Sequence, residues 1–190
     1  FRGFSGLIST GTVRPGDAVR IVPSGKSSAV KSIITFDGTL DEAVAGQSVT
    51  IILEDEIDCS RGDVIAAANE PPEVSDQFEA TLVWLNDEAL KPGRGYWLKL
   101  ATQTVSASVQ EPNVNPMDHL AVKTLELNAI GVAEVHTDKA IVFEAYADNP
   151  ALGGFILVDK LTNATVAAGM LHFSLRRADN VHWQPTTISR

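Results

Sequence analysis

Two stretches of the chain place apolar residues at every second position, the pattern of a β-strand with one buried face. In residues 47–55, QSVTIILED, the side chains of Val49, Ile51 and Leu53 share a face. In residues 77–85, QFEATLVWL, the shared face is larger and consists of Phe78, Ala80, Leu82 and Trp84. Similar segments recur about every eight to twelve residues between Gly, Pro, Asn and Asp, and hardly any stretch has a helical period. We therefore predict an all-β protein of barrels or sandwiches with very little helix.

Two adjacent prolines suggest where the chain divides. Pro71 and Pro72 cannot donate backbone hydrogen bonds to a sheet and favour an extended, solvated connector. We expect a first domain at about residues 1–72 and a second at about 73–174. Residues 175–190, LRRADNVHWQPTTISR, lack strand alternation and are expected to form a tail or a linker.

Composition narrows the class of protein. The chain has 190 residues, which is long enough for one large all-β domain or two small ones, and 44% of them are hydrophobic, which is ample for a core. The net charge of -9 argues against broad binding of nucleic acid, which requires clustered Lys and Arg. The single cysteine excludes an internal disulfide, no apolar run is long enough to span a membrane, and the first residues lack the basic-then-apolar pattern of a signal peptide. We expect a cytoplasmic protein without a nucleic-acid or membrane partner. Because it starts with FRGFSG and not with Met, we also expect a piece of a longer protein.

The sequence VPSGKSS at residues 22–28 raises the question of a phosphate-binding loop. That loop reads G-x-x-x-x-G-K-[ST], because backbone N–H groups after the first glycine surround the phosphates. The first glycine would stand at position 20, which is Arg20. The following residues, AVKSIITF at 29–36, are rich in β-branched side chains and predict a strand where a phosphate-binding loop needs a helix. Residues 23–26 are therefore interpreted as a turn between two strands.

The residues commonly used in catalysis do not assemble into a recognisable site. No nucleophile elbow G-x-S-x-G occurs. The four histidines are widely scattered and lack the spacing of metal ligands: His119, His136, His172 and His182. We predict no catalytic, cofactor-binding or metal-binding residue in this chain.

An acidic run and the cysteine beside it are two further candidates for a chemical site. The run Glu54-Asp55-Glu56, with Asp58, lacks the alternating ligands and the glycine of a calcium loop and is interpreted as a solvated loop. Arg61 stands close in sequence to Cys59, and a cation beside a thiol can lower its pKa, so a reactive Cys59 is one interpretation. A small buried side chain is the favoured interpretation of Cys59.

Three segments resemble the translation-factor-type GTPases. GTVRPGDAVRIVPSG, residues 11–25, resembles their second domain, with a tight turn at residues 15–17. RGDVI at 61–65 is similar to the end of the same barrel, and residues 143–171 resemble the closing strands of the third domain. The resemblance implies two consecutive β-barrel domains like domains 2 and 3 of those GTPases.

Within that superfamily the chain looks most like the large, GTP-binding subunit of bacterial sulfate adenylyltransferase. Residues 35–63 carry two phrases typical of it, TFDG and LEDEID, and residues 125–135 and 149–170 are similar to its third domain. Elongation factors usually have an arginine where this chain has Gly154. The tail DNVHWQ, residues 179–184, resembles the join to a following adenylylsulfate kinase domain in bifunctional versions.

This resemblance implies a division of labour. GTP and Mg²⁺ would bind an N-terminal GTPase domain of the parent protein, and ATP would bind a separate small catalytic subunit and any kinase domain. The small subunit would join sulfate to the AMP moiety of ATP, and GTP hydrolysis would drive that uphill reaction. The present chain would hold neither active site and would couple the state of the GTPase domain to the partner subunit.

Exposed loops on rigid barrels commonly carry binding, so two loops are candidate contact surfaces, Phe36 to Leu40 and Glu54 to Ser60. The candidate residues are Phe36, Asp37, Glu54, Asp55, Glu56 and Asp58. Solvated turns without a partner are an equally open interpretation of both loops.

Two other functions fit the same fold. The barrels of a translation factor would bind aminoacyl-tRNA and show a basic stripe with a steep salt dependence. The charge of -9 and the glycine at position 154 argue against them. A structural domain of some other GTPase would bind neither RNA nor a nucleotidyltransferase subunit.

Overall fold

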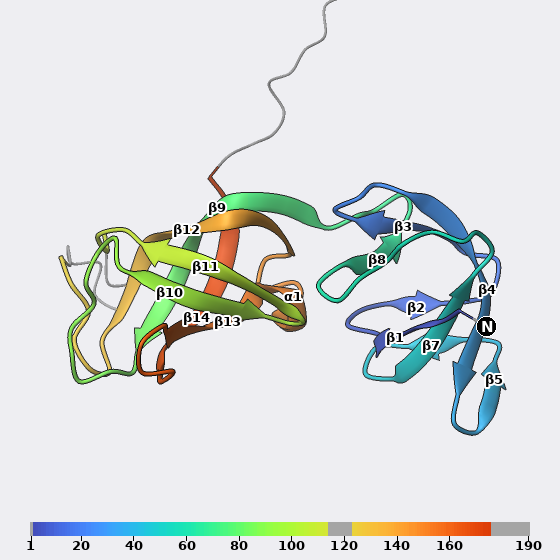
Figure 1. Ribbon diagram of the computed structural model, residues 1–190, viewed down its shortest axis with the longest axis horizontal. Helices are drawn as coiled ribbons and strands as arrows, with labels where there is room; N and C mark the ends of the chain where they lie inside the picture. The colour runs from blue at the N-terminus through green and yellow to red at the C-terminus, as the bar shows by residue number, and fades with distance from the viewer. Residues whose placement is uncertain (1, 114–122, 176–190) are drawn as a thin grey trace, which may run out of the picture.

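The computed structural model of the protein describes residues 2–113 and 123–175. Figure 1 shows two lobes of strands, one blue to teal and one green to red, joined by the segment that leads into β9. Within the described residues, the four-residue α1 (Pro150–Gly153) is the single helix, so the predicted all-β class is confirmed.

The first unit contains a six-stranded sheet and a two-stranded ribbon. The main sheet has the order β1-β7-β4-β3-β8, with β5 paired to β4, and the ribbon pairs β2 with β6. The bounds are β1 (Phe4–Leu7), β2 (Thr12–Val13), β3 (Ala18–Val22), β4 (Ser27–Thr35), β5 (Gly38–Leu40), β6 (Ala43–Val44), β7 (Ser48–Leu53) and β8 (Val64–Ala67). Ala43 of the ribbon lies in the same core as the main sheet, so the ribbon packs over the sheet's apolar side.

The core of the first unit is aliphatic. As the alternation predicts, Val49, Ile51 and Leu53 of β7 are buried. They pack with Val19, Ile21, Val30, Ile33 and Ala43. The opposite face of β7 is mixed, with Ser48 exposed and Thr50 and Ile52 half-buried.

Residues 23–26 form a turn between two strands, as predicted, and Ser27 of the GKS segment already belongs to the second strand. β3 ends at Val22 and β4 begins at Ser27, and Gly25 has a φ of 76°, in the left-handed region that favours glycine. The backbone N–H of Gly25 donates to the carbonyl of Ile21 (2.7 Å), which closes the turn. The expected turn at residues 15–17 is also present, with a φ of 92° at Gly16.

The second unit is a closed barrel, called the second barrel below. Its strand order is β10-β11-β12-β9-β14-β13, and every neighbouring pair is antiparallel. The bounds are β9 (Glu73–Trp84), β10 (Gly95–Leu100), β11 (Gln103–Val109), β12 (Ile130–Phe143), β13 (Gly154–Asp159) and β14 (Thr165–Ser174).

Aromatic side chains fill much of the second barrel. Phe78 and Trp84 of β9 are fully buried, and the predicted inward set of this strand is confirmed. The ring of Phe78 meets that of Phe143 edge-on, with centroids 4.8 Å apart, and Trp84 meets Tyr96 in the same way at 6.0 Å. Edge-to-face pairs of this kind add to the free energy gained from burial alone.

The short helix α1 positions a close backbone contact. The side chain of Asn149 caps the helix by accepting from the N–H of Ala151 (3.1 Å), and Pro150 stands in the first turn. At the other end, a Cβ on Gly153 would lie 2.4 Å from backbone atoms of Tyr146. Glycine at this position therefore lets the loop before the helix pack directly on its end.

The two units also touch each other outside the connector. Nδ2 of Asn149, which is almost completely buried, lies 3.5 Å from Oγ of Ser9 in the first unit and donates to Glu144 at 2.7 Å. Val64 of β8 packs against the core of the second barrel. The predicted tail or linker at residues 175–190, with its DNVHWQ sequence, lies outside the described residues except for Leu175.

Candidate functional site

The hairpin of β4 and β5 presents Phe36 at its tip. Thr35 pairs with Gly38, so the loop consists of Phe36 and Asp37, and the Thr35 hydroxyl donates to the Gly38 carbonyl (3.2 Å). Phe36 is fully exposed, at 104% of its reference area. Covering a phenyl ring contributes about 1.5–3 kcal/mol, so a partner that buried Phe36 would gain that amount of free energy.

The acidic loop lies at the opposite end of the same strand. The N–H of Glu54 donates to the carbonyl of Ala29 (3.0 Å), and the Ser28 hydroxyl donates to Asp55 (2.8 Å). Eight residues separate Ser28 from Phe36 along the extended chain, a span of roughly 26 Å. The structure therefore separates the predicted contact residues into two surfaces.

Most of the acidic loop is occupied by contacts within the chain. Glu54 pairs with Lys31 (3.6 Å), and Asp58 pairs with Arg2 (2.7 Å). The hydrogen bond and the charge of Arg2 hold the pKa of Asp58 below its ordinary value. Glu56 is exposed and has no ion pair among the described residues. The described residues also contain no group of side chains suited to a metal ion. Glu56 is thus the carboxylate of this loop most available to a partner.

The less favoured interpretation of Cys59, a thiol whose pKa is lowered by Arg61, is wrong. Burial raises the pKa of the Cys59 thiol, and the nearby carboxylate of Asp63 raises it further. The side chain is half-buried and packs against the core of the first unit. Cys59 therefore behaves as a small core residue, which was the favoured interpretation.

Two of the four histidines lie within the described residues, and both contact carboxylates on the second barrel. Nδ1 of His172 lies 3.0 Å from Glu79, and its Nε2 lies 2.9 Å from the Thr81 hydroxyl. Nε2 of His136 lies 3.5 Å from Glu134. His119 and His182 lie outside the described residues.

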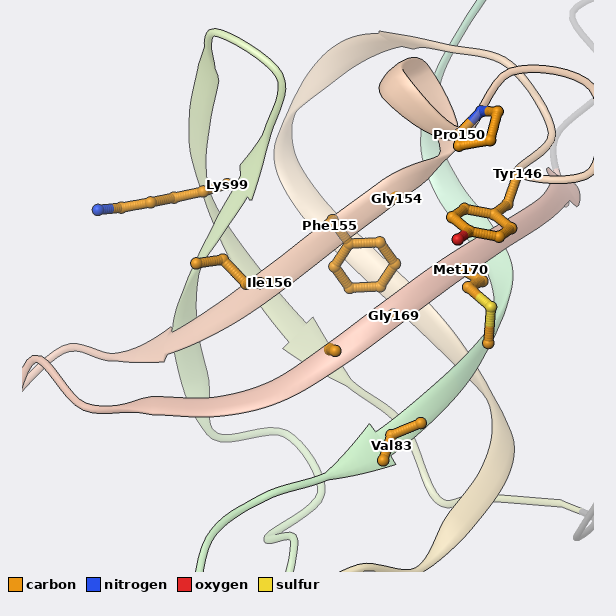
Figure 2. Close-up of a pocket in the computed structure, with 10 residues that line it drawn as sticks. Val83, Lys99, Tyr146, Pro150, Gly154, Phe155, Ile156, Gly169 and Met170 are labelled. Carbon is orange, nitrogen blue, oxygen red and sulfur yellow. The ribbon is translucent and has the colours of Figure 1, made fainter.

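A surface that the sequence did not predict lies on the outside of the second barrel (Figure 2). It is a depression of about 540 Å³ lined mainly by apolar side chains of β9, β13 and β14. Pairing places Ile156, Ala168 and Val83 side by side on three neighbouring strands. The small Ala168 leaves a hollow between two larger side chains. Such a row depends on strand register, which no local pattern of residues reveals.

Close packing by itself accounts for the glycine at position 154. A Cβ on Gly154 would lie 2.9 Å from the carbonyl oxygen of Pro150 and 3.2 Å from the ring of Tyr146. A larger residue would require this loop to move. The absence of arginine here therefore says little about RNA binding.

No helix in residues 2–113 and 123–175 is both long enough and apolar enough to cross a membrane.

Family models match both halves of the chain. The model for elongation factor Tu domain 2 matches residues 4–66, and the model described as GTP-eEF1A C-terminal domain-like matches residues 77–172. Among solved structures, Sup35 complexed with GMPPNP has a TM-score of 0.78 and 18% identity over 90% of this chain and 44% of its own. That likeness concerns the fold.

Sequence relatives are much more similar. The bifunctional enzyme NodQ of Rhizobium sp. (strain N33) is 46% identical over 100% of this chain, which spans 30% of NodQ. The bifunctional enzyme CysN/CysC of Xylella fastidiosa is 48% identical over 99% of the chain and 31% of its own length. Sulfate adenylyltransferase subunit 1 of Saccharophagus degradans is 46% identical over 90% of the chain and 37% of its own length.

The chain thus spans about a third of the length of the curated relatives that it matches. The GTP-eEF1A C-terminal domain-like match covers just over half of the 190 residues, and the domain 2 match covers most of the rest. Together with the closed second barrel, these matches show that the chain belongs to the GTP-eEF1A C-terminal domain-like family, with an elongation factor Tu domain 2-like unit preceding that domain.

Proposed function

We propose that this chain is the non-catalytic two-barrel portion of the GTP-hydrolysing subunit of a sulfate adenylyltransferase. The observation that carries the proposal is the identity of 46–48% to NodQ, CysN/CysC and sulfate adenylyltransferase subunit 1 across 90–100% of the chain. The solved structure of Sup35 complexed with GMPPNP, which has the same fold, shares 18% identity with the chain.

In this proposal the parent protein takes part in sulfate assimilation in the cytoplasm. Its partner, a small catalytic subunit, converts ATP and sulfate into adenylylsulfate and pyrophosphate. GTP and Mg²⁺ bind the N-terminal GTPase domain that precedes this chain, and ATP binds the partner. The names of the bifunctional relatives support a further adenylylsulfate kinase domain in the parent.

The role of this chain would be to transmit the state of the GTPase domain to the partner. The fully exposed ring of Phe36, beside Asp37, supports the β4–β5 tip as the contact surface, and Glu56 supports a second contact at the other end of β4. Glu54, Asp55 and Asp58 would contribute less, because each already has a partner within the chain.

We also propose domain limits of 1–72 and 73–174, followed by a linker or tail at 175–190. The interval between the end of β8 at Ala67 and the start of β9 at Glu73 supports the first limit.

Sequencing the parent reading frame on both sides of this chain tests the proposal. A G-x-x-x-x-G-K-[ST] loop upstream and a second one after residue 190 are expected for the bifunctional form. A stop codon just beyond residue 190 would remove the kinase and leave sulfate adenylyltransferase and a translation factor to be separated by assay. Absence of any such loop upstream would refute the GTPase parent.

A further inference from the structure

The hollow on the second barrel is the middle of a row that crosses five strands. Lys99 pairs with Ile156, Ile156 with Ala168, Ala168 with Val83, and Val83 with Ile130. Ile156 is 37% exposed, while Val83 and Ala168 are partly buried. Figure 2 shows the ring of Tyr146 at one end of the depression and the Lys99 ammonium turned away from it. The row therefore forms an apolar surface whose single cationic side chain, Lys99, lies at one end.

Further along the same outer face, two carboxylates stand directly opposite each other. Glu79 of β9 pairs with Glu134 of β12, and like charges in that position repel. Their side chains are 33% and 45% exposed. Each touches an imidazole, and neither forms an ion pair with a Lys or Arg of the described residues. The pair of carboxylates thus lacks a fixed cation and would be stabilised by one from outside.

Strand alternation puts this acidic pair and the apolar hollow on one face. Val83, Thr81 and Glu79 are alternate residues of β9, whereas Leu82 and Ala80 face the core. Thr81 is also buried, with its hydroxyl beside the ring of His172. Four residues of extended chain separate Val83 from Glu79, a distance of roughly 13 Å. An apolar depression rimmed by polar groups is typical of a protein contact surface.

The closed barrel limits how a partner can bind here. All six strands have two neighbours, so this barrel offers no free strand edge to extend by backbone pairing. Recognition must come from side chains that fit the hollow and the carboxylates.

We propose that the outer face of β9, β12, β13 and β14 docks a segment of the small catalytic subunit, with an apolar side chain over Ala168 and a Lys or Arg between Glu79 and Glu134. This inference rests on the proposed function, because it takes the partner from there. It assigns the partner's contact to the second barrel in addition to the Phe36 tip of the first unit.

The experiment measures the affinity of the purified small subunit for the intact parent protein and its variants. Glu79→Gln/Glu134→Gln removes both charges but keeps an amide oxygen as acceptor for His172, and Ala168→Arg fills the hollow. Glu111→Gln/Glu126→Gln, at two other exposed positions of this unit, is the matched control. We expect each test variant to weaken binding at least about fivefold and the double glutamine variant to flatten the salt dependence, while the control stays within about twofold.

Unfolding midpoints followed by tryptophan fluorescence check that every variant is folded. If the folded test variants bind with wild-type affinity and salt dependence, this inference is overturned. Weakened binding of Phe36→Ala in the same experiment would leave the proposed function standing. No binding of the small subunit to the unmodified parent would overturn the proposed function, and this inference with it.

Discussion

The two units of this chain differ in how their sheets close and in what fills their cores. The second barrel closes on itself around a core with aromatic pairs, whereas the main sheet of the first unit ends at β1 and β8 and encloses a smaller aliphatic core. A closed sheet has no edge strand to which a partner could add, so a partner must bind it through side chains. The first unit instead projects a hairpin with an exposed phenyl ring. The comparison indicates that the second barrel supplies most of the stability, and that the first unit offers the more protruding contact.

Truncating the aromatic core should have the largest effect. Phe78→Ala removes a fully buried ring that packs on Phe143, so we expect about 3–5 kcal/mol loss in the free energy of unfolding. Two of the three tryptophans, Trp84 and Trp97, lie in the second barrel, and Trp183 lies outside the described residues, so the response of tryptophan fluorescence to urea reports mainly on this unit. The first 72 residues contain no tryptophan.

Ile33→Ala in the core of the first unit is the matched comparison. It should shift the far-ultraviolet circular dichroism transition and leave the fluorescence midpoint nearly unchanged. If both probes shift together for both variants, the two units unfold as one, and the proposed difference in stability between them is wrong.

Adding one methyl group to a glycine should lower stability much more in the second barrel than in the first unit. Gly153→Ala places a Cβ against backbone atoms of Tyr146, where no side chain can give way, and we expect a loss of about 1–3 kcal/mol. In the first unit, Gly6→Ala meets nothing within 4 Å and should change stability by less than about 0.5 kcal/mol. Thermal unfolding of both variants measures the difference, and equal effects would contradict the packing assigned to α1.

Two aspartates predict different responses to pH. The pKa of Asp159 is lowered by the backbone N–H groups of Thr162 and Leu161, and further by Arg94. Its side chain is 5% exposed, whereas that of Asp58, also with a lowered pKa, is 80% exposed. Because exposed pairs contribute little, Asp159→Asn should lower the urea midpoint at pH 7 and Asp58→Asn should hardly change it.

The sign of the pH effect follows from the direction of the shift. A carboxyl with a lowered pKa in the folded state stabilises the fold above its ordinary value of 3.8, and this contribution is lost as the pH falls through the lowered pKa. The difference between wild type and Asp159→Asn should therefore shrink as the pH is brought from 7 toward 3. A difference independent of pH would exclude the ionised carboxylate as its origin.

The smallest change in stability is expected for Phe36→Ala. The ring contacts solvent on all sides, so the free energy of unfolding should change by less than about 0.5 kcal/mol. Affinity for the small subunit should fall at least about tenfold if the ring is an anchor. Unchanged affinity would remove the hairpin tip from the proposed contact.

Local patterns in the sequence predicted the strands well. The alternation in residues 47–55 and 77–85 identified the buried faces of β7 and β9, and the missing glycine at Arg20 identified the GKS segment as a turn. These features depend on residues close together in the chain.

Features that depend on register could not be predicted in this way. The antiparallel pairing of β4 with β7 separates Phe36 from the acidic loop. Ile156, Ala168 and Val83 meet because three strands distant in sequence align. The thiol of Cys59 responds to burial and Asp63 more than to its neighbour in sequence, Arg61.

The most direct test of the central claim is the rate of adenylylsulfate formation by the intact parent protein with its small subunit. We expect pyrophosphate release that requires ATP and sulfate and rises when GTP is added, while the isolated 190-residue chain binds no GTP in calorimetry. A rate indifferent to GTP, together with tight and salt-dependent binding of aminoacyl-tRNA, would contradict the claim and assign these barrels to a translation factor.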